Sequence, residues 1–172
     1  MTTTSGAKTI SFAGHAANSP QFDALYSEGM SLVETTAAYL DGPGRSAARK
    51  LRAPAAALYA GESLALTTRL MQLASWLLLQ RSLNTGEMSR EQVMQERRKL
   101  ALGQESRSAP SAADFAELPA AFRELLEQAR RLEVRIRKLD ESLMRDNLLP
   151  EAGAGNQVIA QIDLLQTAFG RR

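Results

Sequence analysis

The sequence has 172 residues, with no cysteine and only one histidine, His15. Without cysteine the chain has no disulfide, thiolate metal ligand or thiol nucleophile, and it suits a reducing compartment such as the cytoplasm. A single histidine, outside any HExxH or Glu-x-x-His pattern, excludes the usual zinc and di-iron sites of helical proteins. A glycine-rich phosphate loop after a strand is also absent. We therefore expect a cytoplasmic protein that is not an enzyme, with no cofactor, no metal and no catalytic residues.

The sequence also lacks an apolar run long enough to cross a membrane. Its most apolar stretch, the eleven residues between Arg69 and Arg81, contains eight apolar side chains. As a helix this stretch spans about 16 Å, roughly half the thickness of the hydrocarbon layer. The residues before Ile10 do not have the pattern of a signal peptide. We expect no membrane partner.

The sequence has little excess of charge of either sign. The net charge is +2. Residues 45–53 are basic, and residues 89–104 hold four basic and two acidic side chains. An excess of two charges on one helix produces only a weak field, so we expect no nucleic acid partner.

The apolar pattern predicts an all-α fold, a bundle of three long helices with a shorter fourth helix. We expect a flexible arm over residues 1–19, the helical bundle domain over residues 20–149 and a C-terminal tail over residues 150–172. Helices are predicted from Pro20 to about Leu40, from Pro54 to about Asn84, from a capping box at Ser89–Gln92 to about Leu102, and from about Leu118 to Leu149. Residues 45–53 could add a short turn of helix.

The last of these helices has the most regular pattern. Its apolar residues alternate spacings of four and three over more than three heptads: Leu118, Phe122, Leu125, Ala129, Leu132, Ile136, Leu139 and Leu143. This pattern is typical of a helix that buries one narrow face. Residues 103–113 are predicted to form a mobile loop before it, although Asp114 with Glu117 could cap the helix earlier and leave Pro119 as a kink. Asp140 and Glu141 are expected to be surface charges, and residues 97–99 to lie on a solvated face.

The helix predicted over residues 54–84 has apolar residues on two sides. A helical wheel places one broad apolar face on Leu66, Leu70, Met71, Leu73, Ala74, Leu77 and Leu78, with Trp76 and Leu79 nearly opposite. A helix that is apolar on both sides has to be covered on both. The simplest cover for the second side is a partner subunit, so we predict a homodimer interface at Trp76, Leu79 and Gln72. An aromatic residue inside a leucine-rich helix usually belongs to the core or to a subunit interface.

The tail carries a second short apolar stripe, formed by Val158, Ile162, Leu165 and Phe169. About fourteen residues are too few for a stable isolated helix in water, so this segment needs a surface to dock on. We predict that these four residues bind a protein partner. The alternative is that they pack back on their own bundle as a further helix.

Three stretches of the sequence, together with a shorter one, resemble one known family. They are YSEGM (26–30), TAAYLDGPGR (36–45), TTRLMQLASWLLLQR (67–81) and GEM (86–88). The sequence resembles the alphaproteobacterial family of the regulator of CtrA degradation, over roughly residues 20–100. The resemblance implies a dimeric bundle of three long helices. It also implies a non-enzymatic adaptor that delivers cell-cycle regulatory substrates to the ClpXP protease, with a flexible C-terminal tail that contributes to delivery.

Two other classes of function remain open at this point. In a DNA-binding regulator, residues 89–102 would be the recognition helix, and binding to duplex DNA would weaken steeply with salt. In a small-ligand-binding helical regulator, a ligand would raise the melting temperature.

Overall fold

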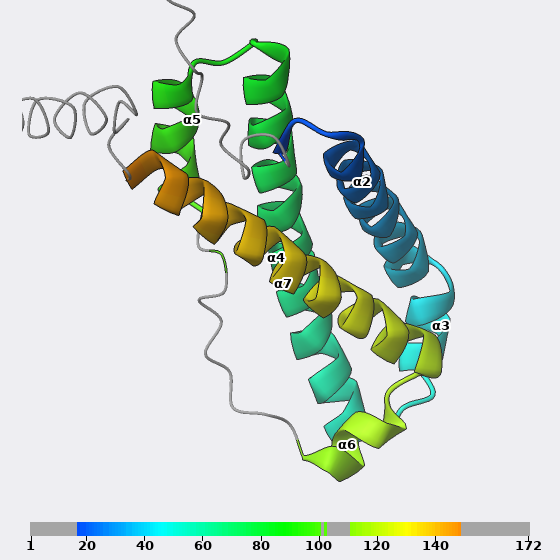
Figure 1. Cartoon of the computed structure of the whole chain (residues 1–172). Helices are drawn as coiled ribbons and strands as arrows, with labels where there is room; N and C mark the ends of the chain where they lie inside the picture. The colour runs from blue at the N-terminus through cyan, green and yellow to red at the C-terminus, as the bar shows by residue number, and fades with distance from the viewer. Residues whose placement is uncertain (1–16, 101, 103–110, 149–172) are drawn as a thin grey trace, which may run out of the picture.

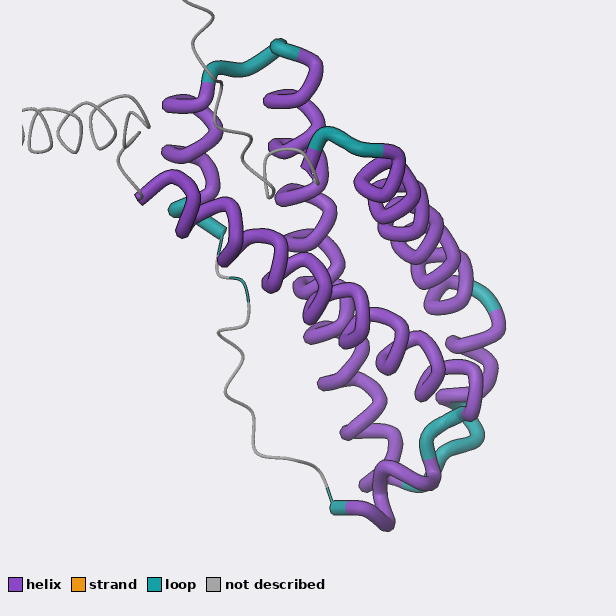
Figure 2. Tube along the Cα trace, viewed as in Figure 1, coloured by secondary structure: helices purple, strands orange, loops and turns teal. Residues whose placement is uncertain are grey.

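The computed structural model describes residues 17–100, 102 and 111–148, and these residues form helices joined by short connections (Figures 1 and 2). In chain order the helices are α2 (Pro20–Asp41), α3 (Pro43–Ala48), α4 (Ala53–Thr85), α5 (Arg90–Arg97), α6 (Ala112–Glu117) and α7 (Ala120–Leu148). None of the described residues lies in a strand. The predicted all-α fold with three long helices is therefore confirmed, with 22, 33 and 29 residues in α2, α4 and α7.

Local signals in the sequence account for most of the helix ends. Pro20, Pro43 and Pro54 each lie in the first turn of a helix, where a missing amide proton costs nothing. Gly86 ends α4 in a left-handed conformation with φ 76°, which suits glycine. Ser89 opens α5 through the predicted capping box, in which its hydroxyl accepts a hydrogen bond from the backbone amide of Gln92.

The structure corrects the sequence-based predictions at two connections. The helix that begins after Ser89 ends at Arg97, earlier than the predicted Leu102. Residues 112 and 113, predicted as loop, begin α6, whose first turn is capped by the Ser111 hydroxyl. Leu118 is extended, with ψ 144°, because the residue before a proline avoids the helical conformation. Pro119 therefore separates two helices and does not kink one.

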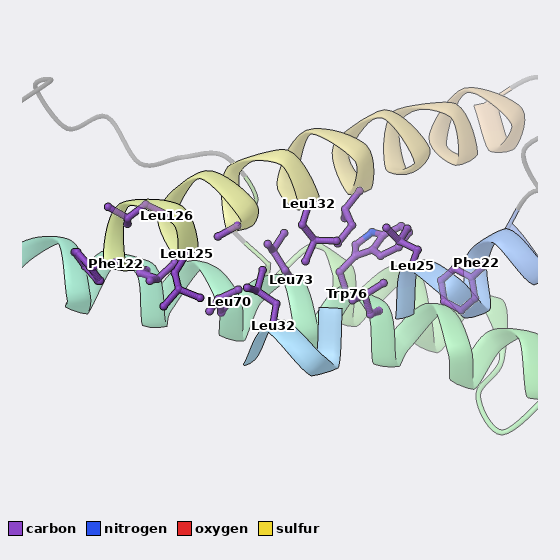
Figure 3. Close-up of a cluster of buried hydrophobic side chains, with 14 of the residues drawn as sticks. Phe22, Leu25, Leu32, Leu70, Leu73, Trp76, Phe122, Leu125, Leu126 and Leu132 are labelled. Atoms are coloured by element: carbon purple, nitrogen blue, oxygen red, sulfur yellow. The ribbon is translucent and has the colours of Figure 1, made fainter. Parts of the chain in front are cut away.

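The core lies where α7 crosses α4 and α2 (Figure 1). The predicted heptad of α7 forms its face of this core, and all of its residues are buried except Leu139, which is partly exposed. The opposing side chains come mainly from α4 and α2, and Figure 3 shows them interleaved. Those that the figure labels include Phe22, Leu25, Leu32, Leu70 and Leu73. Leu66 and Leu77 belong to the same buried cluster.

Gly29 is buried at the contact between α2 and α4. A Cβ atom at this position would lie 2.4 Å from Cδ1 of Leu77, whose side chain is itself fully buried. The absence of a side chain therefore lets the two helices approach closely. Glycine inside a helix costs about 1 kcal/mol in helix propensity, and the closer packing offsets this cost.

The surface of α7 that faces away from the core carries ion pairs. Arg135 bonds to Glu28 of α2 at 2.6 Å, while Arg130 and Arg131 both bond to Glu127. These two arginine hydrogen bonds lower the pKa of the exposed Glu127 to about 2. Glu127 is therefore ionised at neutral pH and can pair with both arginines.

Candidate partner-binding surfaces

Trp76 lies in the core of its own chain, where it is only 1% exposed. Figure 3 shows its indole among the buried side chains, near Leu25 of α2. The predicted wheel was wrong at this point. The buried arc of α4 is centred on Leu73 and Leu77, so it takes in Trp76 and leaves Met71 and Leu78 outside. Trp76 therefore belongs to the core of its own chain and not to the predicted dimer interface.

The indole of Trp76 is part of a polar cluster that the sequence did not predict. The indole nitrogen donates a hydrogen bond to Oδ1 of Asp140 at 2.5 Å. The guanidinium of Arg97 pairs with the same carboxylate oxygen and lies over the indole ring, 5.6 Å from its centre. This cluster of Trp76, Arg97 and Asp140 ties α4, α5 and α7 together.

The positions of Arg97 and Asp140 correct two predictions. Arg97 was expected on a solvated face but is only 7% exposed, and Asp140 was expected to be a surface charge but is mostly buried. Burial lowers the pKa of Arg97 from its ordinary value, which is the cost of moving a charge away from water. Asp140 compensates for that cost by supplying the opposite charge. The cluster therefore connects three helices through one buried ion pair and one hydrogen bond.

The large apolar residues that α4 leaves exposed follow one line. Leu64 and Met71 are both 66% exposed and Leu78 is 49% exposed, at intervals of seven residues. Intervals of seven place side chains on the same face of a helix, two turns apart. None of the described elements covers this line. We call Leu64, Met71 and Leu78, with Thr68 and Ser75 between them, the α4 outer stripe.

The two polar residues within the stripe are satisfied by their own helix. The Thr68 hydroxyl donates to the carbonyl oxygen of Leu64 at 3.0 Å, and the Ser75 hydroxyl donates to that of Met71 at 2.8 Å. A hydroxyl bonded in this way has less need of water, so covering it costs less free energy. Thr68 and Ser75 are also small, which leaves shallow gaps between the apolar side chains. The stripe therefore has the composition and shape of a helix-binding surface.

The remaining predicted site residues fall beside the stripe or outside the described residues. Gln72 and Leu79 are each partly exposed on α4. The predicted tail residues, Val158, Ile162, Leu165 and Phe169, lie outside the residues that the structure describes. The structure therefore places only Gln72 and Leu79 of the predicted interface at the surface.

Across residues 17–100, 102 and 111–148, no three His, Asp or Glu side chains come together in a group that could hold a metal ion. In this same part of the chain, no helix combines the length and apolarity needed to span a bilayer. The α4 outer stripe is an exposed apolar face of a helix, which suits protein contacts.

The chain matches a family described as protein of unknown function (DUF1465), over residues 13–169. Among solved structures it is similar to RcdA from Caulobacter crescentus CB15, at 44% sequence identity and a TM-score of 0.59. The similarity covers 76% of this chain and 94% of the RcdA chain. No curated protein matches. The family match over most of the chain and the identity to RcdA confirm the resemblance seen in the sequence, and the chain belongs to the RcdA-like DUF1465 family.

Proposed function

We propose that the chain is a non-enzymatic adaptor that delivers cell-cycle regulatory proteins to the ClpXP protease. The observation that carries the proposal is the similarity to RcdA, which extends over nearly the whole RcdA chain at 44% identity. The α4 outer stripe supports it, because it offers a contact surface without any group suited to catalysis.

An adaptor of this kind acts through contacts alone. It raises the local concentration of a client at the protease by holding both partners at once, so the two binding surfaces need only be distinct and simultaneously accessible. The α4 outer stripe and the C-terminal tail are candidates for separate contacts. The tail follows α7, whereas the stripe lies on α4.

We propose further that the chain is a homodimer in the cytoplasm and that the α4 outer stripe lies in its interface. The prediction of a second apolar side on this helix is kept, but its centre moves from Trp76 to Met71. A two-fold dimer would pair the stripe with itself, so the large residues of one copy could enter the gaps beside Thr68 and Ser75 of the other.

Replacing Met71 with Arg should convert the dimer to monomer. Each interface would then bury two guanidinium groups without partners, and we expect dimer affinity to fall at least about a hundredfold. Sedimentation velocity over a range of concentrations measures this. Val134 is the matched control, since it is 40% exposed on α7 and outside the stripe, so its replacement by Arg should leave the dimer intact. A wild-type monomer, or a Met71→Arg dimer of unchanged affinity, would contradict the interface.

Cutting the chain after Pro150 should abolish delivery while leaving the melting temperature nearly unchanged. The readout is the half-life of each cellular protein after synthesis is blocked, followed by mass spectrometry in cells with the full chain, with the truncated chain and with no chain. Clients should be stabilised equally in the last two, and ClpX depletion should remove the difference between all three. If the tail is instead a docked helix, the cut should lower the melting temperature by several degrees. If no protein has a half-life that depends on both the chain and ClpX, the adaptor function is wrong.

The structure counts against the DNA-binding alternative. The predicted recognition helix is only the eight residues of α5, and its Arg97 is buried against Asp140. A recognition helix needs its basic side chains free to enter the major groove. We therefore favour the adaptor.

A further inference from the structure

A stretch of the bundle without negative charge lies around α3. Between Asp41 and Glu62 the sequence has no acidic residue and four basic ones, at Arg45, Arg49, Lys50 and Arg52. This segment turns back on itself, because its short helix α3 connects the end of α2 to the start of α4. Figure 1 shows α3 at one end of the bundle, so the segment that carries these basic residues lies at that end.

A groove with a volume of about 440 Å³ opens between α3 and the first turns of α4. Its walls and floor are apolar, formed by Leu40, Ala48, Ala60 and the ring of Tyr59. Arg45, Arg49 and Ser63 also line it. The groove thus combines an apolar floor with cationic edges.

The floor of the groove is held rigidly by the core. Tyr59 is buried, and its ring packs against Phe122 of α7 with 4.5 Å between the ring centres. Gly44 allows α3 to lie directly on this tyrosine, since a Cβ atom there would be 2.5 Å from the Tyr59 hydroxyl oxygen. The groove is therefore a fixed consequence of how α3 packs, and a ligand would not have to form it.

The cationic edges are available to a partner. In the part of the chain that the structure describes, no ion pair is formed by Arg49 or Lys50. Arg45 pairs with Asp41 at 3.0 Å, but both side chains are mostly exposed to water, so this pair is weak and easily exchanged. Arg52 is held by Glu117 of α6. Of the two arginines that line the groove, Arg49 forms no ion pair among the described residues, and Arg45 has only the exposed pair with Asp41.

We propose that this α3–α4 groove binds an acidic peptide segment of a partner protein, with an apolar side chain on the Tyr59 floor and carboxylates at Arg45 and Arg49. Charge complementarity identifies the occupant, because an apolar anchor alone would not require cationic edges and a small anion would not require an apolar floor. The inference rests on the proposed adaptor function, for which the groove is a client or protease contact distinct from the α4 outer stripe.

The test is fluorescence anisotropy of the full-length protein with labelled peptides of sequence EELLEE, EESSEE and KKLLKK. The first should bind at least about tenfold more tightly than the other two, and its affinity should fall as salt rises from about 50 to about 300 mM. Arg49→Glu should weaken the binding of EELLEE by about tenfold or more, because it places a negative charge beside the peptide carboxylates. Ala60→Trp should weaken it by a similar factor, because the larger side chain fills the groove. Both side chains are exposed, so folding should be preserved. Arg137→Glu, on the exposed surface of α7, is the matched control and should bind normally.

Several outcomes would contradict the proposal that the groove binds an acidic peptide. They are no binding of EELLEE, equal binding of KKLLKK, or unchanged affinity in both the Arg49→Glu and the Ala60→Trp variants. Two measurements together separate the groove proposal from the adaptor proposal. They are peptide binding and the protein half-lives described above, repeated in cells that carry the Arg49→Glu chain. If ClpX-dependent clients exist but EELLEE does not bind, only the groove is wrong. If EELLEE binds as expected but no client depends on the chain, only the adaptor function is wrong.

Discussion

Replacing Trp76 with alanine should lower the free energy of unfolding by about 3–5 kcal/mol. The indole is the largest fully buried side chain in the described part of the bundle, and it contacts groups from α2, α5 and α7. Its removal would leave a cavity between these helices and would take away a hydrogen-bond donor from Asp140. For a chain of this size we expect the melting temperature to fall by about 10 °C or more, as measured by circular dichroism during thermal and urea unfolding.

The same variant distinguishes a core residue from an interface residue. Because Trp76 is covered by its own chain, Trp76→Ala protein should still sediment as a dimer at temperatures where it is folded. Leu78→Ala is the matched control. Its side chain is 49% exposed on the α4 outer stripe, so this change should weaken the dimer and have little effect on the stability of the subunit. Dissociation of folded Trp76→Ala protein, with little loss of subunit stability, would contradict this assignment.

Most of the helical framework could be predicted because its signals are local. The prolines in the first turns of α2 and α4, Gly86 after α4 and the capping box at Ser89 act on the nearest few residues. The heptad of α7 was equally clear, since a single narrow seam packs against the rest of the bundle. What α4 buries was harder to predict. Different helices pack against different sides of α4. The number of apolar residues on one side therefore does not show whether that side is buried or exposed.

The place of Trp76 illustrates the difficulty. On a wheel, Met71 and Leu78 are as apolar as the core leucines, and including them shifts the estimated buried face away from Trp76. The burial of Trp76 depends instead on the path of the chain. After the turn at Gly86, α5 runs back beside α4 and covers the side that carries the indole. No local pattern in the sequence gives the position of a returning helix.

The charged members of the cluster were missed for a related reason. Arg97 and Asp140 are 43 positions apart, and each lies among other charges in the sequence. A signal was nevertheless present. Asp140 follows Ile136 by four residues and precedes Leu143 by three, which places it at the edge of the buried seam, and Arg97 follows the buried Val93 by four. A charge at the edge of an apolar seam suggests a partner from another helix, but only the fold shows which one.

Replacing Asp140 with alanine should destabilise the protein by about 3 kcal/mol or more, because the change leaves a buried charge without its partner. Arg97 would keep its charge with only 7% of its surface exposed, and the indole nitrogen of Trp76 would lose its acceptor. Urea unfolding measures the loss. Glu141→Ala is the matched control, since this neighbouring carboxylate is exposed and its removal should change stability by less than about 0.5 kcal/mol.

A double variant tests whether Asp140→Ala loses stability because the buried charge of Arg97 is left without a partner. Arg97→Met combined with Asp140→Leu removes both charges and keeps similar volumes, so it should recover much of the stability lost in Asp140→Ala. Recovery would show that the pair fixes how α5 sits on α4 and α7 more than it adds net stability. If Asp140→Ala proves as stable as Glu141→Ala, the pair with Arg97 does not hold α5 in place. The double variant could instead be less stable than Asp140→Ala. The ion pair would then stabilise the bundle by its own attraction, and the loss in Asp140→Ala would not come from leaving Arg97 unpaired.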